Sequence, residues 1–431
     1  MIDDKASKKE LANKWTNVLS VGWFLAKRQI KGSNKATTFL IVFIMMLTFL
    51  NLVVISGILI GLIEGGNRAN KEQYTGDVII TTIAGKPDIA HTHELESTLE
   101  KMPGIAKLST RYLQSGQIEA NYKTRRDFGD IQDIVGVQIT GISLDEEDQL
   151  SGLSKFVVEG DFLNESESGY ILIGANLLHR YSSDFGDFFA SLEGVYVGDE
   201  VKVTVGDRTK TFIVKGIVDT KVDQVSMRAF LTKADFWRLV DRPGLNANEI
   251  AMRLEVSPAI TPDGIKSNLV SAGFGDDGKI QTATEAIPDF LNQIKIAFGL
   301  LGNVIGLIGI VVASITIFIV IFINAVTRRK YIGIMKGIGI SEKAIEVSYV
   351  FQSVFYAILG GLLGLFVVYV LLVPLFNAHP LDFPFSDGIL VAPVGSTTFR
   401  FFLLLLVTLI AGYIPARSIV KKNTLDSILG R

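Results

Sequence analysis

Four long runs of apolar residues, separated by polar segments, set the pattern of this 431-residue chain. The runs cover Ala36 to Ile63, Ile296 to Thr327, Val347 to Leu381, and Phe401 to Ala416 with apolar flanks. A helix needs about 20 apolar residues to cross the hydrocarbon core. The first three runs are long enough alone, and the fourth is long enough when it is counted from Thr397 to Val420. The pattern therefore predicts four transmembrane helices.

Between the first and second apolar runs, the pattern changes to that of an α+β domain. Short β-like stretches are separated by Gly, Asp and Asn turns, and two helical stretches stand out at Thr92 to Met102 and at Thr261 to Ala272. The order strand, helix, strand occurs at both ends of the segment, with a β-rich insertion at about 126 to 245 between them. This order predicts a two-lobed domain, whose base comes from the two ends and whose second lobe comes from the middle. The expected strands are Asp77–Ile83, Ile134–Ile142, Tyr170–Ile173, Glu200–Val205, Thr211–Val218 and Glu249–Val256.

Two further helices are expected beside the membrane spans. Ser7 to Lys31 places Leu11, Trp15 and Trp23 near helical spacing among lysines, which predicts an amphipathic helix in the membrane interface. A basic leader without a packed role is the alternative for this segment. Glu285 to Phe298 is predicted to form a helical stalk that continues into the second span.

These patterns give the fold class: an α-helical membrane protein with four transmembrane helices and a large two-lobed α+β extracytoplasmic domain between the first and second. The first apolar run is too long for a cleavable signal peptide, so we expect it to remain as a membrane anchor. The predicted segments, in chain order, are an amphipathic N-terminal helix (1–35), transmembrane helix 1 (36–63), the α+β domain (64–284), the stalk and transmembrane helix 2 (285–327), a cytoplasmic helix (328–346), transmembrane helix 3 (347–374), an extracytoplasmic loop (375–396), transmembrane helix 4 (397–420) and a tail (421–431).

The distribution of charge orients these segments. Residues 1–36 carry eight Lys/Arg against three Asp/Glu, residues 328–346 carry five against two, and residues 417–431 carry four against one. Residues 64–289 carry 23 basic and 36 acidic residues instead. Because short basic loops stay in the cytoplasm, we expect a multi-pass protein of the cytoplasmic (inner) membrane. Both termini and the 328–346 segment would be cytoplasmic, and the large domain would be outside.

Composition excludes several classes of protein. The mean hydropathy of +0.37 is far above that expected of a soluble protein of two or three domains. The chain has no cysteine, so the outer domain folds without disulfides and the chain is not a lipid-modified lipoprotein. An acidic exposed domain leaves no nucleic acid among the expected partners.

Polar and small residues inside the predicted spans carry two further expectations. Asn51 and Gln352 are the notable polar residues at depth, and neither is ionisable, which argues against an ion-coupled secondary transporter. In the third span, Gly360, Gly361 and Gly364 are expected to form a small-residue surface that lets helices pack closely.

Three local patterns resemble catalytic or metal-binding motifs, and each departs from the true motif. Gly273 to Lys279 is one residue short of a phosphate-binding loop, and Ile280 stands where a Ser or Thr would hold Mg²⁺. His91 and His93 are expected to be exposed turn residues. The acidic run Asp145 to Asp148 lacks the spaced oxygens of a calcium loop and is expected to be a solvated turn. We therefore expect no catalytic residue, metal or cofactor in this chain.

The segment Thr327 to Gly364 carries the most specific pattern. It begins T-R-R-K-Y-I-G-I-M-K-G-I-G-I-S-E-K-A-I-E-V and ends A-I-L-G-G-L-L-G. It resembles the signature R-x-x-E-I-G-I-L-x-A-L-G-A-x-x-x-x-I of the FtsX-like permease family of ABC transporters, which includes macrolide-exporter and lipoprotein-releasing permeases. Tyr331 stands where the family usually has Glu, and Gly337 where it usually has Ala. The closing Y-I-P-A-R-S-I-V-K-K-N-T-L-D-S-I-L is also similar, with Thr424 in place of the usual proline.

The resemblance implies that residues 328–343 form a cytoplasmic coupling helix seated in a groove of a separate ATPase. Tyr331, Ile334, Met335 and Ile338 would otherwise be exposed to water, which agrees with this role. An ordinary basic loop is the alternative. The candidate coupling residues are Arg328, Arg329, Lys330, Tyr331, Gly333, Ile334, Met335, Lys336, Gly337, Ile338 and Gly339.

The same resemblance implies the wider assembly. Two permease chains, identical or different, would pair with two ATPase subunits that bind ATP and Mg²⁺, and closure of the ATPases would move the outer domains. The leading hypothesis is a permease in membrane lipid that acts on a lipoprotein, peptide or other amphipathic substrate. The long loop from Phe376 to Ser396 favours lipoprotein release. The alternative is a signalling permease, similar to division-linked members, that activates an extracytoplasmic protein partner without transport.

Overall fold

The structure is a computed structural model, and it describes residues 2–123, 132–182, 190–241, 244, 246–287, 289–383 and 386–421. For residues 2–14, 182 and 289–291 it describes the backbone alone. Most of the predicted tail, including Thr424, lies outside the described residues. The chain divides into two compact units, which we call the helical unit (Met1–Leu62, Gln293–Leu381 and Gly388–Arg431) and the α+β unit (Ile63–Asn292 and Asp382–Asp387).

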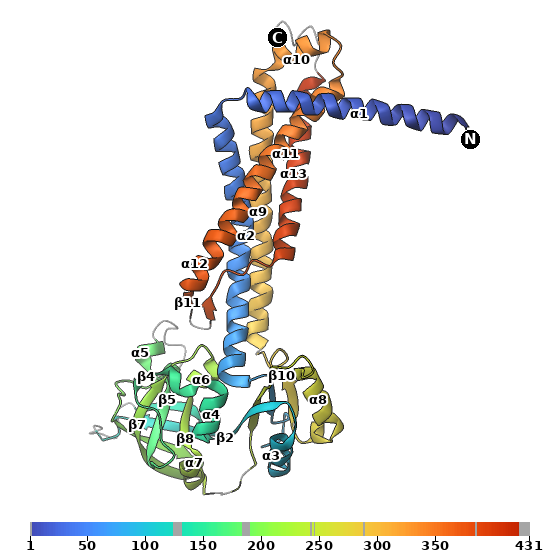
Figure 1. Cartoon of the computed structure of the whole chain (residues 1–431). Coiled ribbons are helices and arrows are strands. Elements are labelled where there is room, and N and C mark those ends of the chain that lie inside the picture. Colours follow the sequence, from blue (N-terminus) through green and yellow to red (C-terminus); the bar gives the residue numbers. More distant parts are fainter. Residues whose placement is uncertain are drawn as a thin grey trace. The chain divides into compact units, whose positions relative to one another are not determined.

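The helical unit contains the four predicted spans (Figure 1). Four of its helices are long and apolar enough to cross a membrane, by length and composition. The third of these, from Glu342 to Ala378, runs through a π-helical turn. The helices of this part of the chain are α1 (Ile2–Lys31), α2 (Lys35–Asn70), α9 (Asp289–Thr327), α10 (Arg329–Gly337), α11 (Glu342–Phe366), η6 (Val367–Leu372), α12 (Val373–Ala378) and α13 (Val394–Val420).

The N-terminal helix α1 packs along α11. The rings of Trp23 and Phe351 meet edge to face with their centroids 5.5 Å apart. Gly22 allows close approach, because a Cβ there would lie 2.8 Å from Val347 Cγ1. Lys343 lies 4.9 Å from the ring centroid of Trp15, a cation–π distance. This segment therefore has a packed role, which a plain basic leader would not have.

The stalks of the first and second spans are both continuous helices. α9 runs unbroken from Asp289 into the second span, as the sequence predicts. α2 extends further than predicted. It passes the end of the apolar run at Ile63, continues to Asn70 and leads into the π-helical η1 (Lys71–Thr75). Glycines near its end allow close packing. A Cβ on Gly65 would lie 2.2 Å from Ser386 Oγ.

Six strands of the α+β unit pair in a ring. The C-terminal half of β2 pairs with β3 and β6, β3 pairs with β8, β8 with β5, β5 with β7, and β7 with β6. The β3–β8 and β5–β7 pairs are parallel and the others are antiparallel. The strands of the ring are β2 (Ile105–Ala120), β3 (Asp133–Ile142), β5 (Tyr170–Gly174), β6 (Glu200–Val205), β7 (Arg208–Val218) and β8 (Arg228–Thr232).

The rest of the sheet comes from the two ends of the segment. β1 (Val78–Thr81) lies between β9 (Glu249–Leu254) and β10 (Lys279–Thr282), and β9 also pairs with the N-terminal half of β2. β2 therefore joins this base to the ring. The predicted lobes share one sheet, and the largest hydrophobic cluster contains residues of both. Other elements described here are α3 (Thr92–Lys101), α4 (Leu144–Ser151), η2 (Leu153–Phe156), β4 (Val157–Gly160), η3 (Ala175–Leu177), α5 (His179–Ser182), α6 (Asp223–Ser226), α7 (Lys233–Val240), α8 (Pro262–Ser271) and η5 (Phe274–Asp276).

A short hairpin replaces the loop predicted between the third and fourth spans. β11 (Leu381–Phe383) and β12 (Ser386–Gly388) form a two-stranded sheet, and Asp382–Asp387 group with the α+β unit. Lys221 of that unit holds the hairpin. Its Nζ forms an ion pair with Asp382, donates to Phe383 O at 3.1 Å and lies 3.8 Å from the Asp387 carboxylate.

Candidate functional site

The helix α10 occupies the segment where the sequence predicts a coupling helix. Gly339, at φ +94°, ends it in a backbone conformation that favours glycine. The next helix, α11, begins after Ser341, whose Oγ accepts a hydrogen bond from the Ala344 backbone N–H at 3.3 Å. α10 is therefore a separate short helix between two long ones. Arg328 precedes its first turn, and Arg329, Lys330, Gly333 and Gly337 lie within it.

One face of α10 packs against the other helices. Ile332 is buried, and Met335 contacts the same hydrophobic cluster. The side chain of Lys336 is only 8% exposed, because its Nζ donates to Val420 O at 2.9 Å and pairs with Glu342 at 2.7 Å. The prediction that Met335 lies on the exposed face is therefore wrong.

The opposite face of α10 is apolar and exposed. Tyr331 is 68% exposed, Ile334 46% and Ile338 73%. These residues follow one another at spacings of three and four, which places them on one side of a helix. We call this set the α10 face. An exposed apolar stripe opposite a packed face is the arrangement expected of a docking helix.

The three predicted glycines of the third span serve close packing. Gly360 and Gly364 lie against α2, and a Cβ added to Gly360 would lie 2.5 Å from Met45 Cβ. Gly361 lies against α13, where its Cβ would be 2.5 Å from the ring of Phe401. α11 can therefore contact both neighbours only with small residues at these positions.

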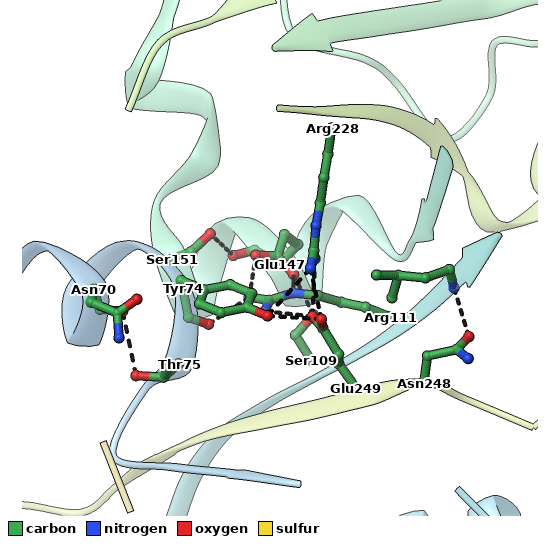
Figure 2. Close-up of polar contacts among 11 residues, drawn as sticks. Asn70, Tyr74, Thr75, Ser109, Arg111, Glu147, Ser151, Arg228, Asn248 and Glu249 are labelled. Atoms are coloured by element: carbon green, nitrogen blue, oxygen red, sulfur yellow. Dashed lines mark hydrogen bonds and ion pairs between the residues drawn. The ribbon is translucent and has the colours of Figure 1, made fainter. Parts of the chain in front are cut away.

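A second notable site is a buried set of charges in the α+β unit (Figure 2). Arg111 of β2 donates two hydrogen bonds to the Glu147 carboxylate of α4, from Nε to Oε2 at 2.7 Å and from Nη2 to Oε1 at 2.8 Å. Arg228 of β8 also donates two hydrogen bonds to one carboxylate, that of Glu249 in β9. They run from Nη1 to Oε2 at 3.0 Å and from Nη2 to Oε1 at 2.7 Å. Arg111 Nη1 lies 3.5 Å from Glu249 Oε2, so the two bidentate pairs form one network.

Tyr74 of η1 inserts its side chain between these charges, as Figure 2 shows. Its hydroxyl donates to Glu249 Oε1 at 2.7 Å and accepts from Arg228 Nη2 at 3.3 Å. Its carbonyl accepts from Arg111 Nη2 at 2.8 Å. The guanidinium carbons of Arg111 and Arg228 lie 5.0 and 5.2 Å from the ring centroid, within cation–π range. We call Tyr74, Arg111, Glu147, Arg228 and Glu249 the buried ion network.

The electrostatics of the network keep both carboxylates ionised. Burial alone would raise the pKa of Glu249, but the charge and hydrogen bonds of Arg228, followed by the charge of Arg111, outweigh burial and lower this pKa to about 2. Burial would likewise raise the pKa of Glu147, and the charge and hydrogen bonds of Arg111 lower it. Ser109 adds a further hydrogen bond to Glu147 at 2.7 Å. The network is therefore a set of permanent charges at neutral pH.

None of these five residues is singled out by the sequence pattern. Glu147 belongs to the run Asp145 to Asp148, and the expectation of a solvated turn there is wrong, because the run opens α4 and Glu147 is buried. One signal is present: Glu249 is a charged residue at the start of a predicted strand, whereas the strand that carries Arg111 is not among those predicted. A charge at an interior strand position needs a buried partner.

The motifs that depart from catalytic patterns take structural places. Gly273 to Lys279 follows helix α8 and leads into strand β10, which reverses the strand–loop–helix order of a phosphate-binding loop. His91 Nδ1 lies 2.9 Å from the Asp277 carboxylate, and His93 Nδ1 lies 3.5 Å from that of Glu96. No group of three or more His, Cys, Asp or Glu able to hold a metal occurs among the residues that the structure describes.

Several known proteins are similar to parts of this chain. Residues 303–424, from α9 through α13, match the model of the FtsX-like permease C-terminal family. The chain is 21% identical over 193 residues to the macrolide export ATP-binding/permease protein MacB of Agrobacterium fabrum, covering 44% of this chain and 28% of that protein. It is 24% identical over 280 residues to an uncharacterized ABC transporter permease of Methanocaldococcus jannaschii, covering 64% of this chain and 65% of that permease.

The C-terminal part of the chain is therefore similar to FtsX-like permeases. The matched region contains α10 and the three packing glycines, so the residues with the most specific sequence pattern are those in the family segment. This permease spans less than a third of the length of the MacB relative and about two thirds of the archaeal one. It is a multi-pass membrane protein with an α+β domain between its first and second spans.

The chain is also similar to two solved structures. It is similar to the periplasmic region of MacB from Actinobacillus actinomycetemcomitans, with 15% identity and a TM-score of 0.32, over 50% of this chain and 90% of that one. It is similar to the extracellular domain of the noncanonic ABC-type transporter YknZ from Gram-positive bacteria, with 12% identity and a TM-score of 0.30, over 48% of this chain and 97% of that one.

Proposed function

We propose that this permease is the membrane subunit of an ABC transporter, in which a separate ATPase drives movement of the extracytoplasmic α+β unit. The observation that carries the proposal is the α10 face. Tyr331, Ile334 and Ile338 expose apolar surface on a short helix between two membrane spans, while the other face of α10 is packed. The match of residues 303–424 to the FtsX-like permease C-terminal family supports a groove of an ATPase as the occupant of that face.

The expected assembly contains two permease chains, identical or different, and two ATPase subunits that bind ATP and Mg²⁺. The substrate class that we propose is an amphipathic molecule outside the cytoplasm, such as a lipoprotein or a peptide. The two continuous stalks support movement of the outer domain as the output, because a continuous helix carries displacement along its axis.

The test of this function is enzymatic. The purified chain alone should hydrolyse no ATP, whereas the complex purified from cells through a tag on the permease should contain an ABC ATPase and hydrolyse ATP. The ATPase is identified by mass spectrometry, and a variant of it without its catalytic glutamate serves as the control for contaminating hydrolysis. Hydrolysis by the lone permease, or a complex without any ATPase, would overturn the proposal.

The proposed orientation places both termini in the cytoplasm and the α+β unit outside. It rests on the excess of basic residues in 1–36, 328–346 and 417–431 and of acidic residues in 64–289. Because the chain has no cysteine, single cysteines can be placed at exposed positions without further changes. We expect Lys210→Cys to react with an impermeant maleimide in intact cells or spheroplasts, and Lys421→Cys to react only after permeabilisation. The reverse pattern would exclude this topology.

A second candidate function is a signalling permease that moves its outer domain to activate a protein partner without transport. One observation favours it. A cavity of about 360 Å³ in the α+β unit is lined largely by polar and acidic side chains, among them Asp219, Asp223, Asp382 and Asp387. Such a lining does not suit an acyl chain. ATP-dependent release of a triacylated lipopeptide from proteoliposomes would support transport, and movement of the outer domain without release would support the second candidate.

A further inference from the structure

Residues of η1 are bound at several points to the α+β unit, including to segments far apart from η1 in the sequence. Lys71 Nζ pairs with Asp77 at 2.6 Å, and the carbonyl of Glu72 accepts from Arg253 of β9 at 3.1 Å. Tyr74 lies in the buried ion network, which reaches β2, α4, β8 and β9. η1 is therefore fixed to the sheet at several points along its length.

η1 is also linked to the hairpin between the third and fourth spans. Gln73 Oε1 accepts a hydrogen bond from the backbone N–H of Lys221 at 3.0 Å. The side chain of Lys221 in turn pairs with Asp382 of the hairpin. Gln73 is thus connected to the hairpin through Lys221, while its neighbour Tyr74 lies in the buried ion network.

The backbone of this segment departs from a regular helix where these contacts begin. η1 is π-helical, and such turns are rare and are found frequently at functional sites. It ends at Gly76, whose φ of +66° favours glycine and whose Cβ, if present, would lie 2.3 Å from Met252 O. The buried side-chain amide of Asn70, just before η1, has no hydrogen-bond partner among the described residues. The helix thus changes geometry directly before a segment that is held at several points.

From this arrangement we infer that Tyr74 is a positioning residue. Through it, the stalk formed by the end of α2 moves the outer domain. The inference rests on the proposed function, because it names the joint at which movement of α2 enters the α+β unit. The ring and hydroxyl of Tyr74 contact two arginines and a glutamate that belong to three different strands. A displacement of α2 is therefore passed to β2, β8 and β9 together, so that the sheet moves as one body.

The test uses the whole chain in lipid nanodiscs, with spin labels at Leu40→Cys on α2 and Lys210→Cys on β7, both exposed positions. The distance distribution between the labels is measured by pulsed electron resonance, for the permease alone and for its ATPase complex with and without ATP and vanadate. In the parent chain we expect a narrow distribution that shifts when nucleotide is trapped. With Tyr74→Leu we expect a broader distribution and loss of the shift, while ATP hydrolysis by the complex continues.

Two further variants separate coupling from folding. Tyr74→Phe removes only the hydroxyl contacts, and we expect it to fold and to reduce the shift. Tyr170→Leu is the matched control, because Tyr170 of β5 also lies at cation–π distance from a cation, Lys215 at 5.2 Å, but lies outside η1. We expect this control to keep the shift of the parent chain. Fluorescence of Trp237 confirms that the outer domain is folded in each variant.

The outcomes distinguish the joint from the proposed function. A full nucleotide-dependent shift of the label distance in Tyr74→Leu would overturn the role of Tyr74 in transmitting movement. The proposed function would still stand. If the parent chain binds no ATPase, or its label distance does not shift with nucleotide, the proposed function fails. The role of Tyr74 is then tested by the distance distributions measured on the permease without ATPase. A broader distribution in Tyr74→Leu than in the parent and in Tyr170→Leu then supports the joint, and an equal width overturns it.

Discussion

Replacing Ile338 with aspartate is expected to weaken binding of the partner ATPase by roughly a hundredfold or more. Ile338 is the most exposed residue of the α10 face, so the change should leave the packing of the permease intact. In the proposed contact the carboxylate would be buried without a partner, which costs on the order of 3–5 kcal/mol. Each 1.4 kcal/mol or so corresponds to a tenfold change in affinity.

The measurement is titration of the purified ATPase onto permease held in nanodiscs, together with ATP hydrolysis by the mixture. Ile334→Asp on the same face should have a similar effect. Ile338→Leu keeps the apolar surface and is the matched control, with expected affinity close to that of the parent. Met335 is not suitable for this test, because it packs against the helical core and a charge there would disturb the permease itself. Unchanged affinity in both Asp variants would mean that α10 is an ordinary basic loop.

Replacing Arg111 with methionine is expected to lower the free energy of unfolding of the α+β unit by about 3–5 kcal/mol, because Glu147 is left as a buried charge without its bidentate partner. The carboxylate would keep the hydrogen bond from Ser109 at 2.7 Å. The pair substitution Arg111→Met with Glu147→Leu removes both charges, and we expect it to recover most of the loss, since apolar side chains of similar size can replace a buried pair at little cost.

Unfolding can be followed in the full chain by tryptophan fluorescence. The chain has three tryptophans, of which Trp15 and Trp23 lie in α1 and Trp237 lies in the α+β unit. With Trp15→Phe and Trp23→Phe as the background, urea unfolding in detergent reports the outer domain through Trp237 alone. A loss below about 1 kcal/mol in Arg111→Met, within the range of surface ion pairs, would show that the network is not a structural support.

The sequence by itself determines the membrane part of this protein, because that part depends on local properties. Length and apolar content define a span, and the described helices contain the four predicted spans, although the third apolar run, to Leu381, outlasts its helix, which ends at Ala378. The same holds for α8, where Thr261 accepts a hydrogen bond from Gly264 N at 3.1 Å and Pro262 opens the first turn. The segment of α10 is also recognised locally, because a specific order of residues marks it.

Tertiary structure decides which side of a predicted helix is exposed and which charges meet. The spacing in α10 admits Met335 on the exposed face, and only the contacts with neighbouring helices show that it packs inward. Arg111 is separated by 36 residues from Glu147 and by 138 from Glu249, so no local pattern can pair them.

The longest described strand, β2, shows why the α+β unit was the harder part to predict. Its middle is buried on both faces because it pairs with β9 along one half and with the ring strands along the other. Residues there, including Ser109, Thr110 and Arg111, are polar and buried together, so the alternation of apolar and polar positions that marks a strand disappears. Polar residues can occupy this interior only because partners from distant segments satisfy them, and those partners are set by the fold as a whole.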